Sequence, residues 1–385
     1  MALTVSQQPQ AYTPAYNSQV FTALSNQIAV ADFKYIVTVQ INGGSIFTEN
    51  ILQRPDGYLV YDPIELVKNY ITRDYFDPTS VTCKYAEGKS CSVEVKIKEY
   101  YTGAIQSTTT INYIAFDACF TDSVFRNYLY TDYVSNGASV YLLENVANEF
   151  LLPDYRVDVK NDVWIHFFKN SCDTIDITHS NGVTITVITL AIPATNNYIY
   201  YANVGYNTLL ANAITPASGD TVTIQIKQGA TVRYTGSYTF TDLCTKFRKY
   251  TIQYLKRNGN IGRFNFEMIS NINVSKKSET VRLNPAKIRS GVYGSNSWDA
   301  EKRTVSTQTT RQLTLNTNWL TAYQSIQLEE LFDSPIKWIV DESENYKSIT
   351  STDMSYKVNE SFGDPLFFYK IECEYDTQET RQRGI

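Results

Sequence analysis

The stretch Phe33-Lys34-Tyr35-Ile36-Val37-Thr38-Val39-Gln40-Ile41, followed at once by Asn42-Gly43-Gly44, decides the fold class of this chain. Every odd-numbered position in it is apolar, and an alternation with a period of two places one face of a strand against a core. An Asn-Gly pair is a preferred turn between antiparallel strands. The stretch therefore predicts a β-hairpin with one buried face.

Short segments with the same alternation recur along the chain. They include Ser92–Tyr100, Val183–Val187 and Val222–Ile226, and the apolar segment Val163–Phe168 is predicted as a buried strand. Turn residues separate many of them at a spacing of about ten residues, which is typical of β-sandwiches. Aromatic residues make up 14% of the chain, and they suit a pleated, half-buried surface. We therefore expect a mainly β protein, with two immunoglobulin-like β-sandwich domains followed by a C-terminal α+β domain with long ribbons or loops.

The length of 385 residues exceeds what one hydrophobic core usually serves. We expect an N-terminal arm over residues 1–20, a sandwich over 21–152, a second sandwich over 153–243 and an assembly domain over 244–385. The boundary near 152 rests on Pro153-Asp154, which follows a segment whose pattern fits either helix or strand. Residues 276–312 are polar and predict long loops or ribbons.

Two helices are expected in this β-rich chain. Asp62-Pro63-Ile64-Glu65 combines an N-cap residue, a proline at the first helical position and a glutamate three residues after the cap. A short helix should therefore follow Asp62 and close one end of the first sandwich. The second helix is predicted from about Ala322 to Phe332, and Ser334-Pro335 ends it.

Charge is unevenly distributed along the sequence. The whole chain carries a net charge of −5, but the segment from Thr245 to Arg311 holds 14 Lys and Arg against 4 Asp and Glu. Such a segment can meet the acidic surface of a neighbouring subunit, bind nucleic acid or remain solvated. We favour the first, with solvation second; binding to nucleic acid is the least favoured, because the nearby aromatic residues follow strand-core spacing instead of offering base-stacking surfaces. The candidate subunit-interface residues are Lys246, Arg248, Lys249, Lys256, Arg257, Arg263, Lys276 and Lys277.

The sequence offers little for catalysis. It contains two histidines: His166 lies in an apolar strand, and His179 lies beside an Asn-Gly turn. A triad built from His179 and Asp176 lacks a nucleophile elbow. Asp173 and Asp176 are three residues apart in a predicted strand and should point to opposite faces, which disfavours a glycosidase pair. We expect no catalytic residue, no cofactor and no metal site.

The cysteines and one lysine motif are further candidates for chemistry. Cys83 and Cys91 flank a possible hairpin turn and could form a disulfide, but free thiols are favoured because no secretory signal is recognisable. No cysteine pair has zinc-ligand spacing. Gly88-Lys89-Ser90 is similar to the end of a phosphate-binding loop, but Cys83 stands where that loop requires a glycine. No stretch is long and apolar enough to span a membrane.

A run without any Asp, Glu, Lys or Arg extends from Ile177 to Gly219. Four tyrosines lie within it: Tyr198, Tyr200, Tyr201 and Tyr206. They could present an aromatic surface to sugars or to another protein, but packing within the core and across strands is the favoured interpretation.

The order of several features completes a resemblance. Thr13-Pro14-Ala15-Tyr16-Asn17 precedes Phe33-Lys34-Tyr35 and Tyr61-Asp62-Pro63; later come Tyr250–Asn258 with Gly259, Trp319-Leu320, and Ser334-Pro335 before Trp338. This order resembles that of virion structural proteins from tailed bacteriophages that infect Bacteroidetes, the crAss-like phages and their relatives. The resemblance implies a β-rich component of the tail or connector region, built as a symmetric ring and without catalysis.

The expected partners follow from this resemblance. They are copies of the chain in a ring and other tail or portal-region proteins, with nucleic acid as a minor contact and no membrane. The expected location is the virion tail and, during assembly, the host cytoplasm. The N-terminal arm and residues 276–312 should become ordered against neighbours. The alternative function is a fibre or surface module that binds glycans through Tyr-rich loops.

Overall fold

The prediction of a mainly β protein is confirmed, because 55% of the residues lie in strands and 10% in helices. The structure is a computed structural model that describes residues 3–72, 76–135, 140–143, 156–158, 160–194, 198–242, 247–283, 286–294, 302–320, 322–340, 346–359, 366–375 and 379–383. The chain divides into two compact units. The first comprises residues 1–243 and 256–261, and the second comprises residues 244–255 and 262–385.

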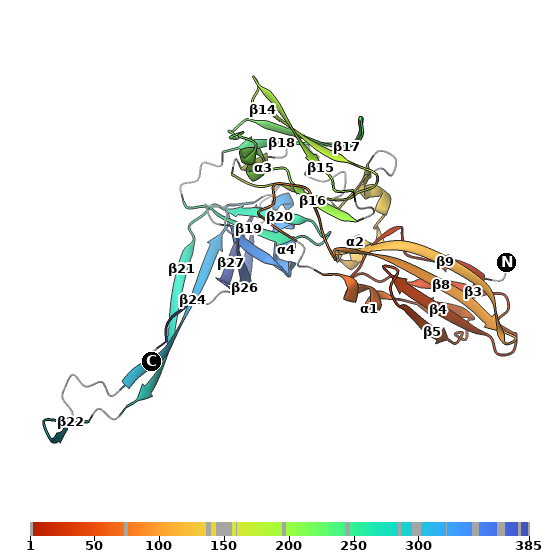
Figure 1. Cartoon of the computed structure of the whole chain (residues 1–385), viewed down its shortest axis with the longest axis horizontal. Coiled ribbons are helices and arrows are strands. Elements are labelled where there is room, and N and C mark those ends of the chain that lie inside the picture. The colour runs from red at the N-terminus through yellow and green to blue at the C-terminus, as the bar shows by residue number, and fades with distance from the viewer. Residues whose placement is uncertain are drawn as a thin grey trace. The chain divides into compact units, whose positions relative to one another are not determined.

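The first unit begins with two sheets that share one hydrophobic core (Figure 1). One sheet has the order β1-β3-β6 and the other β2-β9-β8-β4-β5. Their bounds are β1 Leu3–Gln7, β2 Tyr12–Pro14, β3 Phe21–Ser25, β4 Lys34–Ile41, β5 Ile46–Ile51, β6 Tyr58–Tyr61, β8 Ser90–Tyr101 and β9 Ala104–Phe116. The predicted hairpin is β4–β5, and Tyr35, Val37, Val39 and Ile41 are its buried side chains.

Short helices follow the strands of this first pair of sheets. They are α1 (Ile64–Val67) with the 3-10 helix η1 (Lys68–Tyr70), and α2 (Asp122–Arg126) with the 3-10 helix η2 (Tyr130–Tyr133). The predicted helix after Asp62 is α1. The Asp62 carboxylate accepts the backbone N–H of Ile64 at 3.1 Å and that of Gln19 at 3.1 Å. The N-cap residue of α1 is Pro63 rather than the predicted Asp62, and Asp62, just before it, bonds both to the first residue of the helix and to the N-terminal segment.

Residues 3–20 are built into the sheets, which corrects the expectation of a separate arm. β1 pairs with β3, and β2 pairs in parallel with β9. The side chain of Asn17 exchanges hydrogen bonds of 2.8 Å with the backbone of Phe120 in both directions. Ala15 is fully buried and Gln19 nearly so. The polar composition that suggested an arm instead serves these buried side-chain to backbone bonds.

A second pair of sheets in the first unit shares its own hydrophobic core. Their orders are β10-β11-β13-β16-β7 and β12-β18-β17-β14-β15. The bounds are β7 Lys84–Tyr85, β10 Val134–Ser135, β11 Val140–Leu142, β12 Arg156–Asp158, β13 Trp164–Phe168, β14 Thr174–Ser180, β15 Ile185–Ala191, β16 Ile199–Asn203, β17 Thr221–Gln228 and β18 Thr231–Thr241, with helix α3 at Tyr206–Ala211.

The expected boundary at residue 152 does not separate the two pairs of sheets. β7 precedes it by many residues, yet Tyr85 lies opposite Tyr200 in the second pair. β10 and β11 also precede it and pair within that same sheet. Local patterns could not reveal these long-range pairings. The ambiguous segment 140–152 begins with strand β11, and residues 144–155 lie outside the described part.

The second unit is one large sheet with a helix. The order is β20-β19-β25-β26-β27-β24-β21, and β28 also pairs with β24. The bounds are β19 Tyr250–Leu255, β20 Ile261–Phe266, β21 Asn271–Arg282, β24 Lys302–Asn316, β25 Lys337–Val340, β26 Tyr346–Asn359, β27 Leu366–Tyr375 and β28 Glu379–Arg383, with a small sheet of β22 Lys287–Arg289 and β23 Val292–Gly294. The predicted second helix is α4 (Ala322–Asp333), whose Leu328 and Leu331 are fully buried.

Cys83 and Cys91 are not bonded to each other. Both are free thiols, as favoured above. Cys83 belongs to the core of the second pair of sheets and Cys91 to that of the first pair. Burial raises the pKa of each thiol to about 12, so both remain protonated at neutral pH.

Candidate functional site

The second unit carries a long antiparallel pair of strands, β21 and β24. Their register runs from Asn271 opposite Thr314 to Arg282 opposite Lys302, with one irregularity at Glu279. Figure 1 shows the two strands running side by side toward the small hairpin that contains β22. We call the described residues of this segment, 271–283, 286–294 and 302–316, the ribbon.

The base of the ribbon is anchored in the core of the second unit. Leu313 and Leu315 of β24 are buried, and residues 312–316 of β24 pair with β27 on the side opposite β21. Further along β24, residues 306–309 pair with β28. β24 is therefore a single strand that belongs to both the core sheet and the ribbon.

The rest of the ribbon leaves apolar side chains in solvent. All twelve residues of β21 are exposed. Ile272, Val274 and Val281 are 49%, 60% and 49% exposed. Such residues favour strand geometry, but they gain little from burial where no partner covers them. The ribbon thus places β-branched side chains on a surface that the rest of the described chain leaves uncovered.

The tip of the ribbon is a tight hairpin. Ser290 and Gly291, between β22 and β23, both have positive φ angles, 50° and 82°, the conformation of the turns preferred in two-residue hairpins. Ile288, Val292 and Tyr293 around this turn are 74%, 71% and 63% exposed. The tip therefore offers an aromatic and two aliphatic side chains to solvent.

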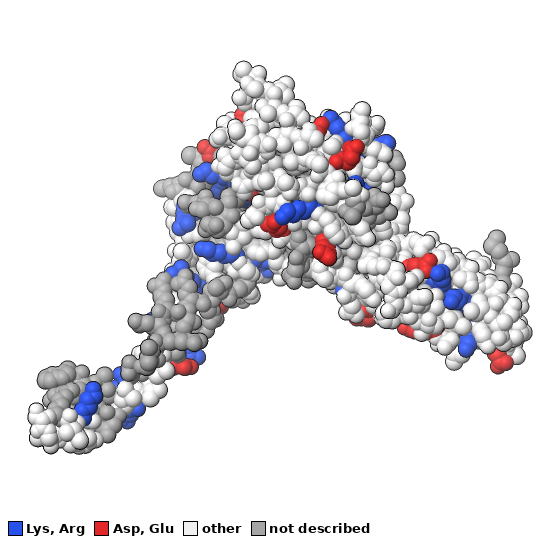
Figure 2. All heavy atoms as spheres, in the orientation of Figure 1, with Lys and Arg blue, Asp and Glu red and all other residues white. Residues whose placement is uncertain are grey.

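The ribbon is also basic. Its described residues include eight Lys and Arg and one acid, Glu279. The basic residues are Lys276, Lys277, Arg282, Lys287, Arg289, Lys302, Arg303 and Arg311. Figure 2 shows blue atoms along this part of the chain. A strand edge that carries lysines resists pairing with an identical edge, so the charge favours a partner of opposite sign.

The predicted interface residues are distributed over several elements. Lys276 and Lys277 lie on the ribbon and are exposed, whereas Lys256 and Arg257 belong to the first unit and are half-buried, as are Lys249 and Arg263 of the second unit. Arg248 is exposed and lies 5.2 Å from the ring centre of Tyr250. Lys246 lies outside the described residues. Sequence reasoning identified the basic segment, but the residues share no single strand or face.

The two histidines have structural partners. His179 is the sixth residue of β14, and its Nε2 lies 2.8 Å from the buried carboxylate of Asp220, which also accepts the N–H of Ala217 at 2.9 Å. His166 Nδ1 lies 2.5 Å from Asn260 Oδ1. Burial, and then the charge of Lys89, hold the pKa of His166 well below its ordinary value. Sequence reasoning could not identify Asp220 or Asn260, which come from distant segments.

The acids considered for catalysis are occupied elsewhere. Asp176 lies 2.5 Å from Lys227 Nζ and accepts the Thr189 hydroxyl at 2.7 Å, while Asp173 accepts the N–H of Gly229 at 2.9 Å. Asp176 therefore does not contact His179, and no triad forms among these residues. Within the described ranges, no group of three or more His, Cys, Asp or Glu could hold a metal ion.

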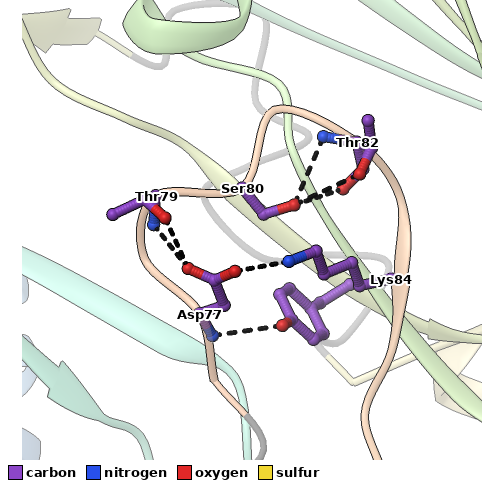
Figure 3. Close-up of polar contacts among 6 residues, drawn as sticks. Asp77, Thr79, Ser80, Thr82 and Lys84 are labelled. Atoms are coloured by element: carbon purple, nitrogen blue, oxygen red, sulfur yellow. Dashed lines mark hydrogen bonds and ion pairs between the residues drawn. The ribbon is translucent and has the colours of Figure 1, made fainter.

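A polar loop before β7 contains a further carboxylate that sequence reasoning missed. Figure 3 shows Asp77 accepting the N–H and hydroxyl of Thr79 and the ammonium of Lys84. The backbone N–H of Asp77 donates to the Tyr201 hydroxyl at 3.1 Å. Lys84 and then Thr79 lower the pKa of the Asp77 carboxyl to about 2. The loop is tied to β16 by these bonds, and its carboxylate is committed to structure.

A groove of about 670 Å³ lies in the first unit. Its lining combines aromatic, hydroxyl and amide side chains with one carboxylate: Tyr12, Tyr113, Tyr198, Ser90, Ser92, Gln40, Asn112 and Glu94, with Ala11, Gly43, Cys91, Val93 and Ile114. Of the tyrosines in the uncharged run, Tyr198 is 38% exposed, whereas Tyr200 and Tyr201 are buried. The predicted packing role holds for the latter two, and Tyr198 alone of these three faces the groove.

Comparison with known proteins gives no relative: no family model matches the chain, and no curated protein matches it. None of the helices in the part of the chain that the structure describes has the length and apolar content to cross a bilayer. A function for the chain must therefore be inferred from its own sequence and geometry.

Proposed function

We propose that this chain is a non-enzymatic structural subunit of a tailed-bacteriophage virion. It forms a ring or hub in the tail or connector region through contacts with copies of itself and with other tail or portal-region proteins. The single observation that carries the proposal is the ribbon, whose strand β21 is exposed at all twelve positions. The resemblance of the sequence to virion proteins of phages infecting Bacteroidetes supports it independently.

The ribbon supports assembly because of its energetics. An antiparallel pair of strands with no covering layer is at best marginally stable in water. Its exposed valines and isoleucines would gain about 0.8 kcal/mol for each methylene that a partner buries. A neighbouring subunit would supply the layer that the described part of the chain does not provide along β21.

Charge indicates the kind of partner. The ribbon is basic, and the chain as a whole carries −5, so the remainder is acidic. A contact between the ribbon of one copy and an acidic surface of the next is a contact between unlike surfaces, which is the type that closes a ring. The same charge also permits a minor contact with nucleic acid.

The proposal includes a finer description of the first unit. Its two pairs of sheets, each around its own core, support an assignment as two immunoglobulin-like sandwiches. In this proposal the sandwiches carry the acidic surface that binds the ribbon of the next copy. The carboxylates of Asp77, Asp173, Asp176 and Asp220 and both histidines make structural bonds, which agrees with a structural role for the chain.

Sedimentation of the full chain at two salt concentrations tests the proposal. At about 50 mM salt we expect oligomers, and at about 500 mM we expect most ribbon contacts to dissociate, because screening weakens exposed charge pairs. Charge reversal of Lys276→Glu with Lys277→Glu should reduce the low-salt assembly to the species present at about 500 mM salt. Electron microscopy of the low-salt sample should show closed rings.

A matched control separates the effect of charges on the ribbon from the effect of the net charge of the chain. The pair Lys98→Glu and Lys160→Glu makes the same change in charge outside the ribbon, on β8 and before β13, and should leave the oligomer intact. A chain that stays monomeric at low salt would contradict the proposal. Equal dissociation of both double variants would also contradict it, because the effect would then follow net charge.

The groove favours one alternative, a glycan-binding module. Tyr198 beside hydroxyl and amide groups is a combination that suits a neutral sugar, with an aromatic face for the ring and polar groups for its hydroxyls. Titration of the chain with soluble host-surface oligosaccharides, with Tyr198→Ala as the comparison, tests this. Saturable binding that Tyr198→Ala removes, in a chain that never oligomerises, would favour the alternative.

A further inference from the structure

β15 (Ile185–Ala191) is the last strand of the sheet β12-β18-β17-β14-β15. It pairs with β14 over all seven residues, from Ile185 opposite Ser180 to Ala191 opposite Thr174, without a bulge. Among the residues that the structure describes, no strand pairs with its other side. β15 is therefore a straight, regular edge strand.

Backbone hydrogen bonds at both ends of the β14–β15 ladder fix which residues face the open side. The N–H of Asn181 donates to the carbonyl of Thr184, and the N–H of Ile192 donates to that of Asp173. Because bonded and non-bonded pairs alternate along an antiparallel ladder, the even-numbered residues of β15 bond to β14. The odd-numbered residues, Ile185, Val187, Thr189 and Ala191, therefore direct their N–H and C=O groups outward.

This edge lacks the features that usually prevent strand addition. Natural edge strands are protected by charged side chains, prolines or bulges; Glu49 on the edge strand β5 and the two adjacent lysines of β21 are examples in this chain. β15 has none of these over its length, and it lies in the run without charge from Ile177 to Gly219. Ile185 and Val187 are 70% and 56% exposed beside it.

We propose that β15 pairs with β15 of a second copy, antiparallel and about a two-fold axis at Ile188. In this register Ile185 lies opposite Ala191 of the second copy, and Val187 lies opposite Thr189 of the second copy. All outward backbone groups of both strands are then paired, giving about eight hydrogen bonds. The two five-stranded sheets become one continuous sheet.

Charge selects a second copy as the occupant. Two neutral strands approach without like-charge repulsion, and a charged partner strand gains nothing from this edge. The nearest ion pair on the same face, Asp176 with Lys227 at 2.5 Å, neutralises itself. The strand β9 is also uncharged, but β2 pairs with its C-terminal end, and the part of it without a second partner carries the exposed polar side chains of Thr108 and Thr110.

This contact is independent of the ribbon, since a backbone ladder is insensitive to salt. The test therefore uses the full chain with Lys276→Glu and Lys277→Glu at about 500 mM salt, where ribbon contacts are weakest. We expect a dimer with a dissociation constant on the order of micromolar. Val187→Lys should weaken it at least about tenfold, because it places a charge on the shared edge.

Thr223→Lys is the matched control. Thr223 on β17 lies opposite Thr178 on β14, and Thr178 in turn lies opposite Val187 on β15. Thr223 is therefore in the same row of side chains as Val187 but two strands away from the edge. It should leave the dimer within about twofold of the parent. Equal loss with both variants would overturn edge pairing, because it would indicate that the face of the sheet packs instead. If the chain with Lys276→Glu and Lys277→Glu but no other substitution stays monomeric at all concentrations, edge pairing is also overturned.

A second measurement needs no substitution in β15. Amide hydrogen exchange followed by NMR should slow for Ile185, Val187, Thr189 and Ala191 as the parent chain is concentrated, while Thr186, Ile188 and Leu190 are protected at every concentration. This alternation is specific to strand pairing. Exchange that is independent of concentration at the odd-numbered residues would overturn the proposal even if Val187→Lys failed to fold.

Discussion

The ammonium group of Lys89 donates a hydrogen bond to the carbonyl of Gly259, a residue 170 positions further along the chain, inside the first unit. Lys89 is fully buried. Its own carbonyl accepts the N–H of Asp117 at 2.8 Å. Burial lowers the pKa of Lys89 to about 7, although the nearby Asp117 raises it. The buried side chain and backbone of Lys89 thus tie the segment of residues 256–261 to β8 and to the residue that follows β9.

This buried lysine predicts a rise of stability with pH. The unfolded chain keeps the lysine proton up to about pH 10.5, whereas the folded chain releases it near pH 7. Between these values the unfolded state binds the extra proton, so the free energy of unfolding should increase by about 1.4 kcal/mol per pH unit from this group. Lys89→Met should remove that slope. Urea unfolding of both chains from about pH 6.5 to 9.5 measures it.

The difference between the two unfolding curves isolates Lys89 from other titrating groups. Lys160→Met, at an exposed position, is the control and should keep the slope of the parent chain. Parallel curves for the parent and Lys89→Met would contradict a depressed pKa at Lys89.

The buried pair of His179 and Asp220 predicts a stability effect without an effect on assembly. Asp220→Ala leaves the buried His179 ring without its partner and the part-buried N–H of Ala217 without its acceptor. We expect a loss of about 2 kcal/mol in the free energy of unfolding, measured by urea titration. Asp242→Asn, at an exposed position after β18, should change it by less than about 0.5 kcal/mol. Similar losses for both variants would show that Asp220 carries no special role.

Substitution of Gly205 is expected to lower the stability of the fold more than any other single substitution proposed for this chain. A Cβ added there would lie 2.3 Å from the backbone nitrogen of Val163 and 2.7 Å from the Cα of Asp162. Backbone cannot move aside as a flexible side chain can, so Gly205→Ala should destabilise the first unit by about 3 kcal/mol or more.

Gly219→Ala is the comparison for Gly205→Ala. Gly219 has a φ of 94°, but nothing lies within 4 Å of its added Cβ. Only conformational strain should appear, at about 1 kcal/mol. Thermal unfolding of the two variants measures the difference, and equal midpoints would contradict the close approach at Gly205.

Local patterns predicted the elements of this chain better than their pairing. The alternation from Phe33 to Ile41 and the apolar face of the helix from Ala322 were sufficient, because strand and helix period are set by neighbouring residues. The placement of β7 beside β16 and of β2 beside β9 was not predictable. Such pairings depend on contacts between distant segments, which leave no periodic signal.

The candidate site was predictable in part for the same reason. The basic composition of residues 245–311 and the ribbon-like polarity of residues 276–312 are properties of the sequence itself. The division of the basic residues between two units depends on the fold, since Lys256 and Arg257 belong to the first unit. The open edge of β15 was also hidden, because a strand's neighbours decide whether it lies at an edge.

The sharing of β24 between the core sheet and the ribbon has a mechanical consequence. The strand runs from Lys302 to Asn316 as one element, and the same backbone that bonds to β21 along its length bonds to β27 at its base. A pull on the tip acts along the strand axis and loads many ladder bonds at once instead of opening them one after another. Because Leu313 and Leu315 of that same strand are buried, a force applied at the far end of the ribbon would pass along the β24 backbone into the core of the second unit.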